Sequence, residues 1–339
     1  MTIHDEIFLR RCFDLARLGT GYVSPNPMVG AVLVYQGRII GEGWHQRWGE
    51  AHAEVNCIRS VKPEERDLIS KSTLYCSLEP CFHVGKTPPC VDLILENRIP
   101  RVVISNVDPN PKVAGQSIVQ LRAAGVEVVA GVLEAEGRQL NRPFFTWITA
   151  QRPYVVLKWA QSTDGYLSRT EERTAISGPA AQRLVHRWRS ESDAILVGNK
   201  TALTDNPRLD ARLYFGKNPL RVVFDAHGKI PPGHHLRDGS IPTWVLDGPI
   251  HIPDLLQRLA ADRRAILLVE GGAHVLHQFL DGGWWDEIRV IENTRLRLGG
   301  GVAAPVLPTT AQLVLKQVLN DDWIRIFEQG VPAEVSALF

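Results

Sequence analysis

The chain has 339 residues, of which 44% are hydrophobic and 22% charged, and this composition excludes disordered and fibrous proteins. Its 38 Lys and Arg residues nearly balance 37 Asp and Glu residues, so the formal net charge of +1 excludes a global positive field that would collect nucleic acid. No apolar run reaches the roughly 20 residues that cross a bilayer, and residues 1–11 carry charges in place of a signal-peptide core. We therefore expect a cytoplasmic protein without a nucleic-acid or membrane partner, and the length favours two domains.

The first part of the chain alternates helical and strand-like segments. Apolar residues at helical spacing predict helices, and β-branched runs predict strands. In chain order, we predict helices at residues 4–18, 51–61, 90–97 and 117–124, and strands at residues 29–35, 38–43, 73–78, 101–105 and 126–130. The strands at 29–35 and 38–43 form a hairpin, and the alternation as a whole predicts a mainly parallel sheet covered by helices.

A polar connection at residues 137–142 leads to a domain boundary near Ala150, so we expect domains at residues 1–150 and 151–339. The alternation then starts afresh. Strands are predicted at residues 154–158, 194–197, 220–224, 244–246 and 265–269, and helices at residues 180–189, 254–261 and 273–280. Both domains are therefore expected to be of the α/β class.

One histidine and two cysteines in the first domain have the pattern of a catalytic zinc site. His52 lies at a predicted helix start, whereas Cys81 and Cys90 follow the next strand. An imidazole and two thiolates leave the fourth tetrahedral position of zinc for water, and the metal lowers the pKa of that water toward about 7. Glu54 lies two residues beyond His52, so it can carry a proton to a departing amine without being a ligand. A His-x-Glu motif followed by Pro-Cys is typical of zinc deaminases that act on bases.

The cysteine pair departs from the usual deaminase signature, because eight residues separate Cys81 from Cys90 instead of two. This insertion predicts a loop over the pocket. The remaining cysteines have no such pattern, and we expect them to pack in the core: Cys12, Cys57 and Cys76. His45 follows a predicted strand, where a surface or capping histidine is the default interpretation.

Several tracts resemble the bifunctional deaminase/reductase family of riboflavin biosynthesis. They are PNPMVG at 25–30, GEGWH at 41–45, HAE at 52–54, EPCFHVGKTPPC at 79–90 and DPNPKVAG at 108–115. Generic cytidine deaminases lack the long tract between the cysteines and the Asp-Pro-Asn-Pro tract, so the resemblance is specific. It covers nearly the whole chain, densely up to Gly115 and more sparsely afterwards.

The resemblance implies a cytidine-deaminase-like three-layer α/β/α domain followed by a dihydrofolate-reductase-like α/β domain. The first would hydrolyse the 2-amino group of 2,5-diamino-6-(5-phosphoribosylamino)pyrimidin-4-one, and the second would reduce the ribosyl side chain to ribityl with NADPH. By the same resemblance, His52, Cys81 and Cys90 would hold one Zn²⁺ and Glu54 would carry protons. The family positions that line the pyrimidine and ribose-phosphate site are Asn26, His45, His83, Lys86, Asp108 and Asn110. Amide and carboxylate groups suit a polar heterocycle, and His and Lys suit a phosphate.

In the second domain, the tract KWAQSTDG at 158–165 is similar to the family's Lys-x-x-x-Ser-x-Asp-Gly tract. The implied substrate-side residues are Lys158, Arg189, Leu209, Arg212 and Glu270, and the implied cofactor-side residues are Ala160, Ala175, Thr201, Asp205, Gly271 and Gly272. Without the resemblance, Lys158 would be interpreted as a solvated lysine at a strand edge. The guanidinium fork of Arg189 suits a phosphate. Ala175 stands where family members often carry Trp, a departure that bears on cofactor affinity.

Two alternatives stay open at this point. One is a deaminase whose second domain is impaired or altered in specificity, and the other is a zinc-stabilised binding or regulatory protein with a closed structural site. The near-zero charge disfavours a third, a nucleic-acid editing deaminase. Trp284 and Trp285 look exposed, and together with the habits of the family they predict a homo-oligomer, a dimer or a tetramer.

Overall fold

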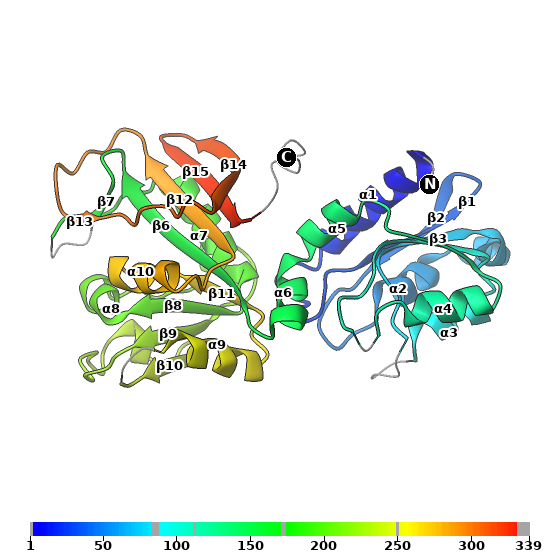
Figure 1. Ribbon diagram of the computed structural model, residues 1–339, viewed down its shortest axis with the longest axis horizontal. Coiled ribbons are helices and arrows are strands. Elements are labelled where there is room, and N and C mark those ends of the chain that lie inside the picture. The colour runs from blue at the N-terminus through cyan, green and yellow to red at the C-terminus, as the bar shows by residue number, and fades with distance from the viewer. Residues whose placement is uncertain (1–2, 83–87, 112, 171–173, 249–250, 331–339) are drawn as a thin grey trace. The chain divides into compact units, whose positions relative to one another are not determined.

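The computed structural model describes residues 3–82, 88–111, 113–170, 174–248 and 251–330. Its contacts divide the chain into two compact units, Met1–Gln151 and Arg152–Phe339 (Figure 1). Within the described ranges, no helix combines the length and the apolar character that a membrane span requires.

The first unit contains a five-stranded sheet in the order β2-β1-β3-β4-β5. Its strands are β1 (Gly30–Tyr35), β2 (Arg38–Trp44), β3 (Thr73–Leu78), β4 (Arg101–Asn106) and β5 (Glu127–Ala130). The predicted strands are confirmed. β2 and β3 both pair antiparallel with β1, whereas β3, β4 and β5 pair parallel, so β1 runs opposite to the other four strands. The expectation of a mainly parallel sheet is therefore confirmed in strand direction, with β1 as the reversed strand. The hairpin at Gln36 and Gly37, whose φ angles are 48° and 77°, reverses the chain between β1 and β2.

Helices cover both faces of this sheet, as the three-layer prediction requires. One face packs against α2 (Ala53–Ser60), α3 (Cys90–Glu96) and α4 (Gln116–Ala123), and the short 3-10 helix η1 (Pro63–Lys71) follows α2. The other face packs against α1 (Ile3–Arg17). The three unpatterned cysteines, Cys12, Cys57 and Cys76, are fully buried in these two cores as expected.

The polar connection predicted at residues 137–142 is wrong, because all of these residues except Asn141 belong to α5 (Glu134–Leu140) or α6 (Arg142–Ala150). Gly137 is a packing position: a Cβ there would lie 2.0 Å from Oδ1 of Asn106, so α5 lies directly against β4. Asn141, between the two helices, exchanges two hydrogen bonds of 2.8 Å with the backbone of Met28. The polar side chains therefore anchor helices here, whereas polar composition alone suggests a loop.

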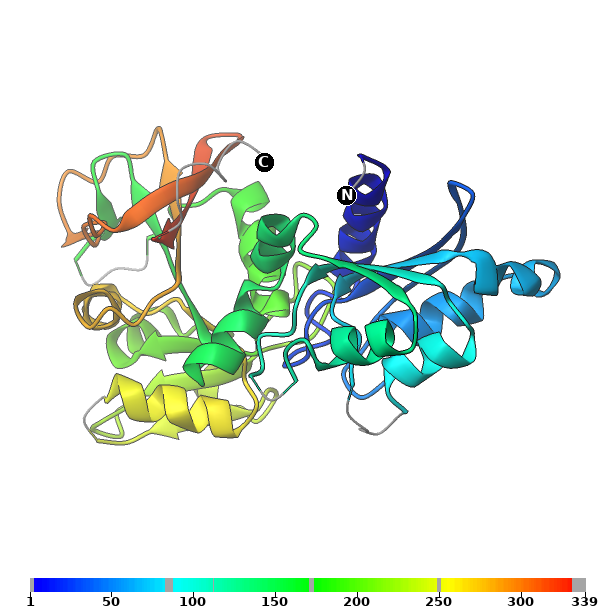
Figure 2. The same ribbon diagram turned by 45° about the vertical axis from the view of Figure 1, so that its right-hand side comes forward.

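The second unit contains an eight-stranded sheet in the order β10-β9-β8-β11-β6-β12-β15-β14. Its strands are β6 (Tyr154–Ser162), β8 (Ala194–Gly198), β9 (Leu220–Phe224), β10 (Thr243–Leu246), β11 (Ile266–Val269), β12 (Glu287–Asn293), β14 (Ala311–Leu319) and β15 (Asp322–Gln329). The first six in spatial order are parallel, and the β14–β15 hairpin, orange to red in Figure 2, continues the sheet antiparallel. A separate small ladder joins β7 (Tyr166–Ser168) and β13 (Val302–Ala303).

Helices also cover both faces of the second sheet. The helices α9 (Ile252–Ala261) and α10 (Ala273–Asp281) pack on one face, and α7 (Pro179–Glu191) and α8 (Asn199–Asp205) pack on the other, while η2 (His235–Arg237) is a short 3-10 turn. The expected α/β class is therefore confirmed for this unit. The expected exposure of the tryptophan pair is wrong: Trp285 is 1% exposed and Trp284 packs against the same core.

Candidate active sites

The three predicted metal ligands converge in the first unit from separate elements. His52 is the residue before α2, Cys81 follows β3, and Cys90 is the first residue of α3. Nδ1 of His52 lies 3.4 Å from each cysteine Sγ, and the three ligand atoms all lie within 4.8 Å of one another. Zinc bonds of about 2.0–2.3 Å place tetrahedral ligand atoms roughly 3.5–3.8 Å apart, so this cluster fits one zinc ion with a coordination position left open.

The protonation of the two thiols also indicates a cation site. The hydrogen bond between the thiols lowers the pKa of Cys81 to about 4 and raises the pKa of Cys90. The backbone N–H of Cys90 also donates to Sγ of Cys81, at 3.2 Å. By themselves, therefore, the two sulfurs stabilise one thiolate between them. A divalent cation supplies the charge that lets both sulfurs ionise as ligands.

Glu54 occupies the first turn of α2, one residue inside the helix start. Its side chain is buried, with 3% of the residue exposed, and it contacts Cys90. Burial raises the pKa of Glu54, which favours the protonated carboxyl group. A carboxyl group in these surroundings next to a metal centre can accept and return a proton.

His45 lies beside this cluster, and the interpretation of it as a surface histidine is wrong. It is 3% exposed, its ring packs edge-on against His52 with centroids 5.5 Å apart, and its Nδ1 lies 3.1 Å from the carbonyl oxygen of Ala51. Its Nε2 lies 3.1 Å from Nδ2 of Asn26. Since the amide nitrogen can only donate, Nε2 accepts this hydrogen bond and Nδ1 carries the proton.

Two further predicted substrate residues of the first unit, Asp108 and Asn110, lie in the loop after β4. Asp108 and Asn110 follow β4, and the backbone N–H of Asn110 donates to Oδ1 of Asp108 at 2.8 Å. His83 and Lys86 lie outside the described residues.

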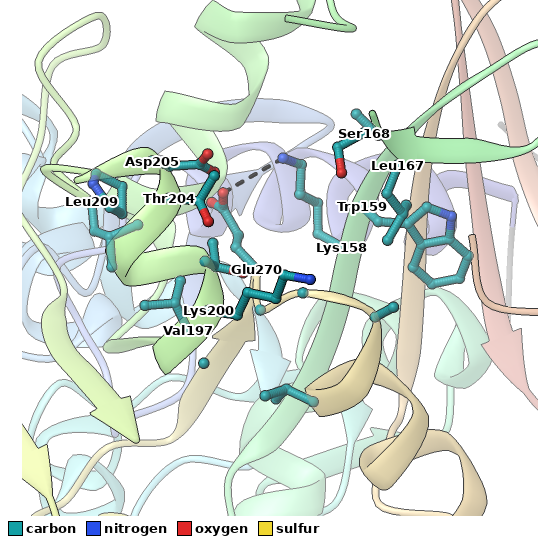
Figure 3. Close-up of a pocket in the computed structure, with 18 of the residues that line it drawn as sticks. Lys158, Trp159, Leu167, Ser168, Val197, Lys200, Thr204, Asp205, Leu209 and Glu270 are labelled. Carbon is teal, nitrogen blue, oxygen red and sulfur yellow. Dashed lines mark hydrogen bonds and ion pairs between the residues drawn. The ribbon is translucent and has the colours of Figure 1, made fainter. Parts of the chain in front are cut away.

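The second unit contains a pocket of about 970 Å³ (Figure 3). Its walls come from β6, β7, α7, α8, the segment 206–212 and the start of α10. All eleven residues predicted for the reductase site line it: Lys158, Ala160, Ala175, Arg189, Thr201, Asp205, Leu209, Arg212, Glu270, Gly271 and Gly272. A Cβ on Gly272 would lie 2.9 Å from Oγ1 of Thr201, so this glycine lets the starts of α8 and α10 pack closely at the pocket wall.

A buried ion triplet lies in the pocket. Glu270 receives two hydrogen bonds from the guanidinium fork of Arg189, at 2.8 and 2.9 Å. It also lies 3.5 Å from Nζ of Lys158 (Figure 3). Burial opposes ionisation of Glu270, but the two cations outweigh it and lower its pKa to about 2. Burial also lowers the pKa of Lys158. Because β6 lies between β11 and β12, the interpretation of Lys158 as a solvated lysine at a strand edge is wrong.

The pocket is strongly basic although the chain is nearly neutral. Its described lining includes six Lys and Arg residues against two carboxylates, a formal excess of +4: Lys158, Arg169, Arg189, Lys200, Arg208 and Arg212 against Asp205 and Glu270. Sequence reasoning missed Arg169, Lys200 and Arg208, because isolated basic residues in loops or at helix starts have no motif. Such a pocket suits ligands that carry several phosphate charges.

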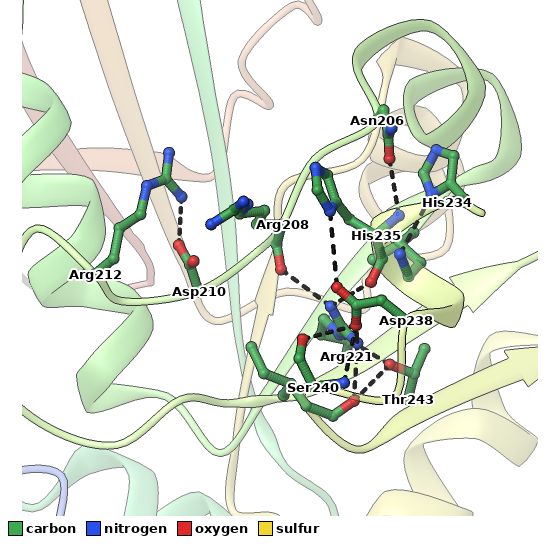
Figure 4. Close-up of polar contacts among 12 residues, drawn as sticks. Asn206, Arg208, Asp210, Arg212, Arg221, His234, His235, Asp238, Ser240 and Thr243 are labelled. Atoms are coloured by element: carbon green, nitrogen blue, oxygen red, sulfur yellow. Dashed lines mark hydrogen bonds and ion pairs between the residues drawn. The ribbon is translucent and has the colours of Figure 1, made fainter.

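Sequence reasoning also missed Arg221, a fully buried residue of β9 (Figure 4). All five N–H groups of its guanidinium donate, to the side chains of Thr243 and Asp238 and to three carbonyl oxygens, those of Arg208, His235 and Ile241. Two of these acceptor residues, Arg208 and His235, line the pocket. Leu209, which follows Arg208 in the chain, has a φ of 51°, a conformation that a leucine adopts only when its surroundings hold it there.

Comparison with known proteins agrees with the division of the chain into two units. The family model of the cytidine and deoxycytidylate deaminase zinc-binding region matches residues 2–106, and that of the RibD C-terminal domain matches residues 153–320. The riboflavin biosynthesis protein RibD of Actinobacillus pleuropneumoniae is 43% identical over 310 residues, which are 83% of this chain and 81% of that protein. The RibD protein of Bacillus amyloliquefaciens is 35% identical over 98% of this chain and 96% of its own length.

A solved structure is similar over both units. It is the diaminohydroxyphosphoribosylaminopyrimidine deaminase/5-amino-6-(5-phosphoribosylamino)uracil reductase of Thermotoga maritima. It matches with a TM-score of 0.88 and 34% sequence identity, covering 96% of this chain and 99% of that one.

The metal cluster makes a direct prediction. Replacing Cys90 with alanine removes one of three ligands, so we expect zinc affinity to fall by more than about 100-fold, since even supporting residues around such sites contribute 10–100-fold. Zinc content after dialysis against a weak chelator, measured by mass spectrometry, reports this loss. The matched control is Cys57→Ala, which removes a fully buried thiol outside the cluster. If Cys90→Ala retained zinc as the wild type does, the assignment of Cys90 as a ligand would be wrong.

Arg221 makes a second prediction. Arg221→Met removes the five hydrogen bonds of a buried guanidinium, including those to the carbonyl groups of Arg208 and His235, so we expect the second unit to lose about 3 kcal/mol of unfolding free energy. Chemical denaturation followed by tryptophan fluorescence measures the loss. Arg295→Met is the control, because the exposed ion pair of Arg295 with Asp321 contributes about 1 kcal/mol or less. Equal destabilisation by both substitutions would contradict the central role of the buried guanidinium.

Proposed function

Since the chain belongs to the bifunctional deaminase/reductase family of riboflavin biosynthesis, we propose that the residues gathered in its two units carry the two successive reactions of that family. The protein is a zinc-dependent pyrimidine deaminase and an NADPH-dependent reductase. The first reaction removes the 2-amino group of 2,5-diamino-6-(5-phosphoribosylamino)pyrimidin-4-one by hydrolysis, and the second reduces the ribosyl side chain to ribityl. The observation that carries the proposal is the convergence of His52, Cys81 and Cys90 beside the buried Glu54.

In the deaminase, we assign His52, Cys81 and Cys90 to zinc, which when bound would act as a Lewis acid that makes water a nucleophile near neutral pH. Glu54 carries a proton from the attacking water to the departing amino group. Its burial excludes bulk water that would compete for this proton. As a result, ammonia leaves in place of the amide anion, which is a far poorer leaving group.

The substrate of the deaminase is a polar heterocycle with a phosphate. We assign the Asn26–His45 pair, which packs against His52, to the pyrimidine edge. Asp108 and Asn110 add hydrogen-bonding groups from the loop after β4. The sequence pattern further assigns His83 and Lys86 to this site. Amide and imidazole groups distinguish amino from carbonyl substituents by their hydrogen bonds.

In the reductase, one pocket accommodates both the substrate and NADPH. Its volume of about 970 Å³ lies at the upper end of the range for small-molecule sites, and its excess of six cations over two carboxylates suits two phosphorylated ligands. We assign Lys158, Arg189, Leu209, Arg212 and Glu270 to the substrate. We assign Ala160, Ala175, Thr201, Asp205, Gly271 and Gly272 to NADPH, with the glycines at the start of α10 where backbone N–H groups suit a phosphate.

We also propose that the enzyme is a cytoplasmic homo-oligomer. Its five cysteines are free, which suits a reducing compartment. In the second unit, β14 is an edge strand whose Leu313 and Val318 are 46% and 60% exposed, a surface that suits pairing with a second copy. The mass in solution, measured by light scattering, tests this assembly.

The role of Glu54 is tested by Glu54→Gln, which keeps the shape of the side chain and removes its ability to carry a proton. We expect kcat of deamination to fall by about 10²–10⁴-fold while zinc stays bound. Ammonia release and zinc content, measured on the same sample, report the two effects, and Glu96→Gln in α3 is the exposed control. Unchanged deamination with zinc bound would refute the mechanism and favour a closed structural zinc site.

The reductase is tested with the deaminated ribosylamino-uracil phosphate and NADPH. We expect the near-ultraviolet absorbance of NADPH to decrease with the wild type. Lys158→Met should slow this reaction by at least about tenfold, because it removes a buried charge that pairs with Glu270. Lys229→Met, an exposed substitution outside the pocket lining, is the control. If the wild type left the absorbance unchanged, the alternative of an impaired or altered reductase, with Ala175 as its mark, would replace the bifunctional proposal.

A further inference from the structure

Glu79 carries a buried carboxylate that has no role so far in either of the two reactions. It directly follows β3, lies two residues before Cys81, and is 6% exposed. Its backbone N–H donates to the carbonyl oxygen of Asn106 at the end of β4, at 2.8 Å. Glu79 therefore lies where the strand that leads to a metal ligand meets the strand that leads to Asp108.

The carboxylate of Glu79 accepts four hydrogen bonds from one neighbouring segment. Its Oε2 accepts from the backbone N–H groups of Asp108, at 3.1 Å, and Gly115, at 2.9 Å. Its Oε1 accepts from the backbone N–H of Ser117, at 3.2 Å, and from the Ser117 hydroxyl, at 2.5 Å. These four bonds use the whole acceptor capacity of a carboxylate.

The donors lie at both ends of the loop that carries two of the proposed substrate residues. Asp108 begins this loop, Asn110 is bonded to Asp108 within it, and Gly115 and Ser117 belong to the start of α4. The first turn of a helix has N–H groups that lack partners within the helix, and a carboxylate satisfies them well. A single side chain therefore closes the loop and fixes it to the strand that precedes Cys81.

We propose that Glu79 is a positioning residue of the deaminase, which holds Asp108 and Asn110 at a fixed place relative to the Cys81 segment. This inference rests on the proposed function, because it takes Asp108 and Asn110 as substrate contacts. Contacts to parts of the substrate that do not react contribute equally to the ground state and the transition state. Loss of the tether should therefore raise KM and leave kcat nearly unchanged.

The test is Glu79→Gln. The glutamine amide keeps one acceptor oxygen, but its NH₂ group replaces the other oxygen and cannot accept from the backbone N–H groups or the Ser117 hydroxyl. We expect KM for the diaminopyrimidine to rise by about tenfold or more, since charge-assisted hydrogen bonds are lost, and kcat to stay within about threefold. Hydrogen–deuterium exchange should become faster at the backbone amides of Asp108, Gly115 and Ser117, because these amides lose their acceptor. Zinc content should stay at the level of the wild type.

Two controls accompany this variant. Ser117→Ala removes one of the four bonds and should raise KM less, and Glu64→Gln, an exposed substitution in η1, should change neither KM nor amide exchange. Zinc content at the level of the wild type shows that the first unit of the variant has folded, and reductase activity shows the same for the second unit. A loss of zinc, a fall in kcat without a change in KM, or unchanged exchange at the three amides would each overturn the positioning role. If the wild type did not deaminate the pyrimidine, the proposed function would fail, and amide exchange would still decide whether Glu79 holds the loop.

Discussion

The deaminase unit depends on one electrostatic constraint, the approach of two thiol sulfurs and an imidazole nitrogen to within 4.8 Å of one another. Without a cation, the two sulfurs stabilise one thiolate, since the pKa of Cys81 is lowered and that of Cys90 is raised. A zinc ion removes this conflict. The end of β3 and the starts of α2 and α3 must therefore stay close together, and all three elements pack in one hydrophobic core.

The pocket of the reductase unit contains buried charges that other side chains compensate. Glu270 is buried, but Arg189 and Lys158 hold it ionised, and the charges of the triplet leave one net positive charge in the pocket. Arg221 is balanced differently, by five acceptors that come from distant parts of the chain. In both arrangements the buried carboxylate or guanidinium has hydrogen-bonding partners, which is the condition under which such a charge is tolerated in a protein interior. In both cases the compensation also fixes residues of the pocket wall.

The sequence predicts those features of the fold and site that depend on local spacing. His52, Cys81 and Cys90 could be predicted because they occur in the order and spacing of the His-x-Glu and Pro-Cys motifs. The environment of His45 could not be predicted in this way, because only the folding of the chain brings Asn26 and His52 into contact with it. Arg221 looks like any polar residue in a strand, since its acceptors are spread over residues 208–243. The β14–β15 hairpin was missed because β14 has largely exposed side chains, and Gly137 resembles a loop residue although it packs against β4.

Three buried glutamates show how surroundings determine the role of one residue type. Glu270 faces two cations, which lower its pKa to about 2, so it is a permanent charge. Glu79 accepts four hydrogen bonds from Asp108, Gly115 and Ser117, so its oxygens are fully occupied. Glu54 has fewer stabilising contacts, and burial outweighs them and raises its pKa. A proton carrier must be able to exist in both protonation states, which the raised pKa of Glu54 favours and the lowered pKa of Glu270 opposes.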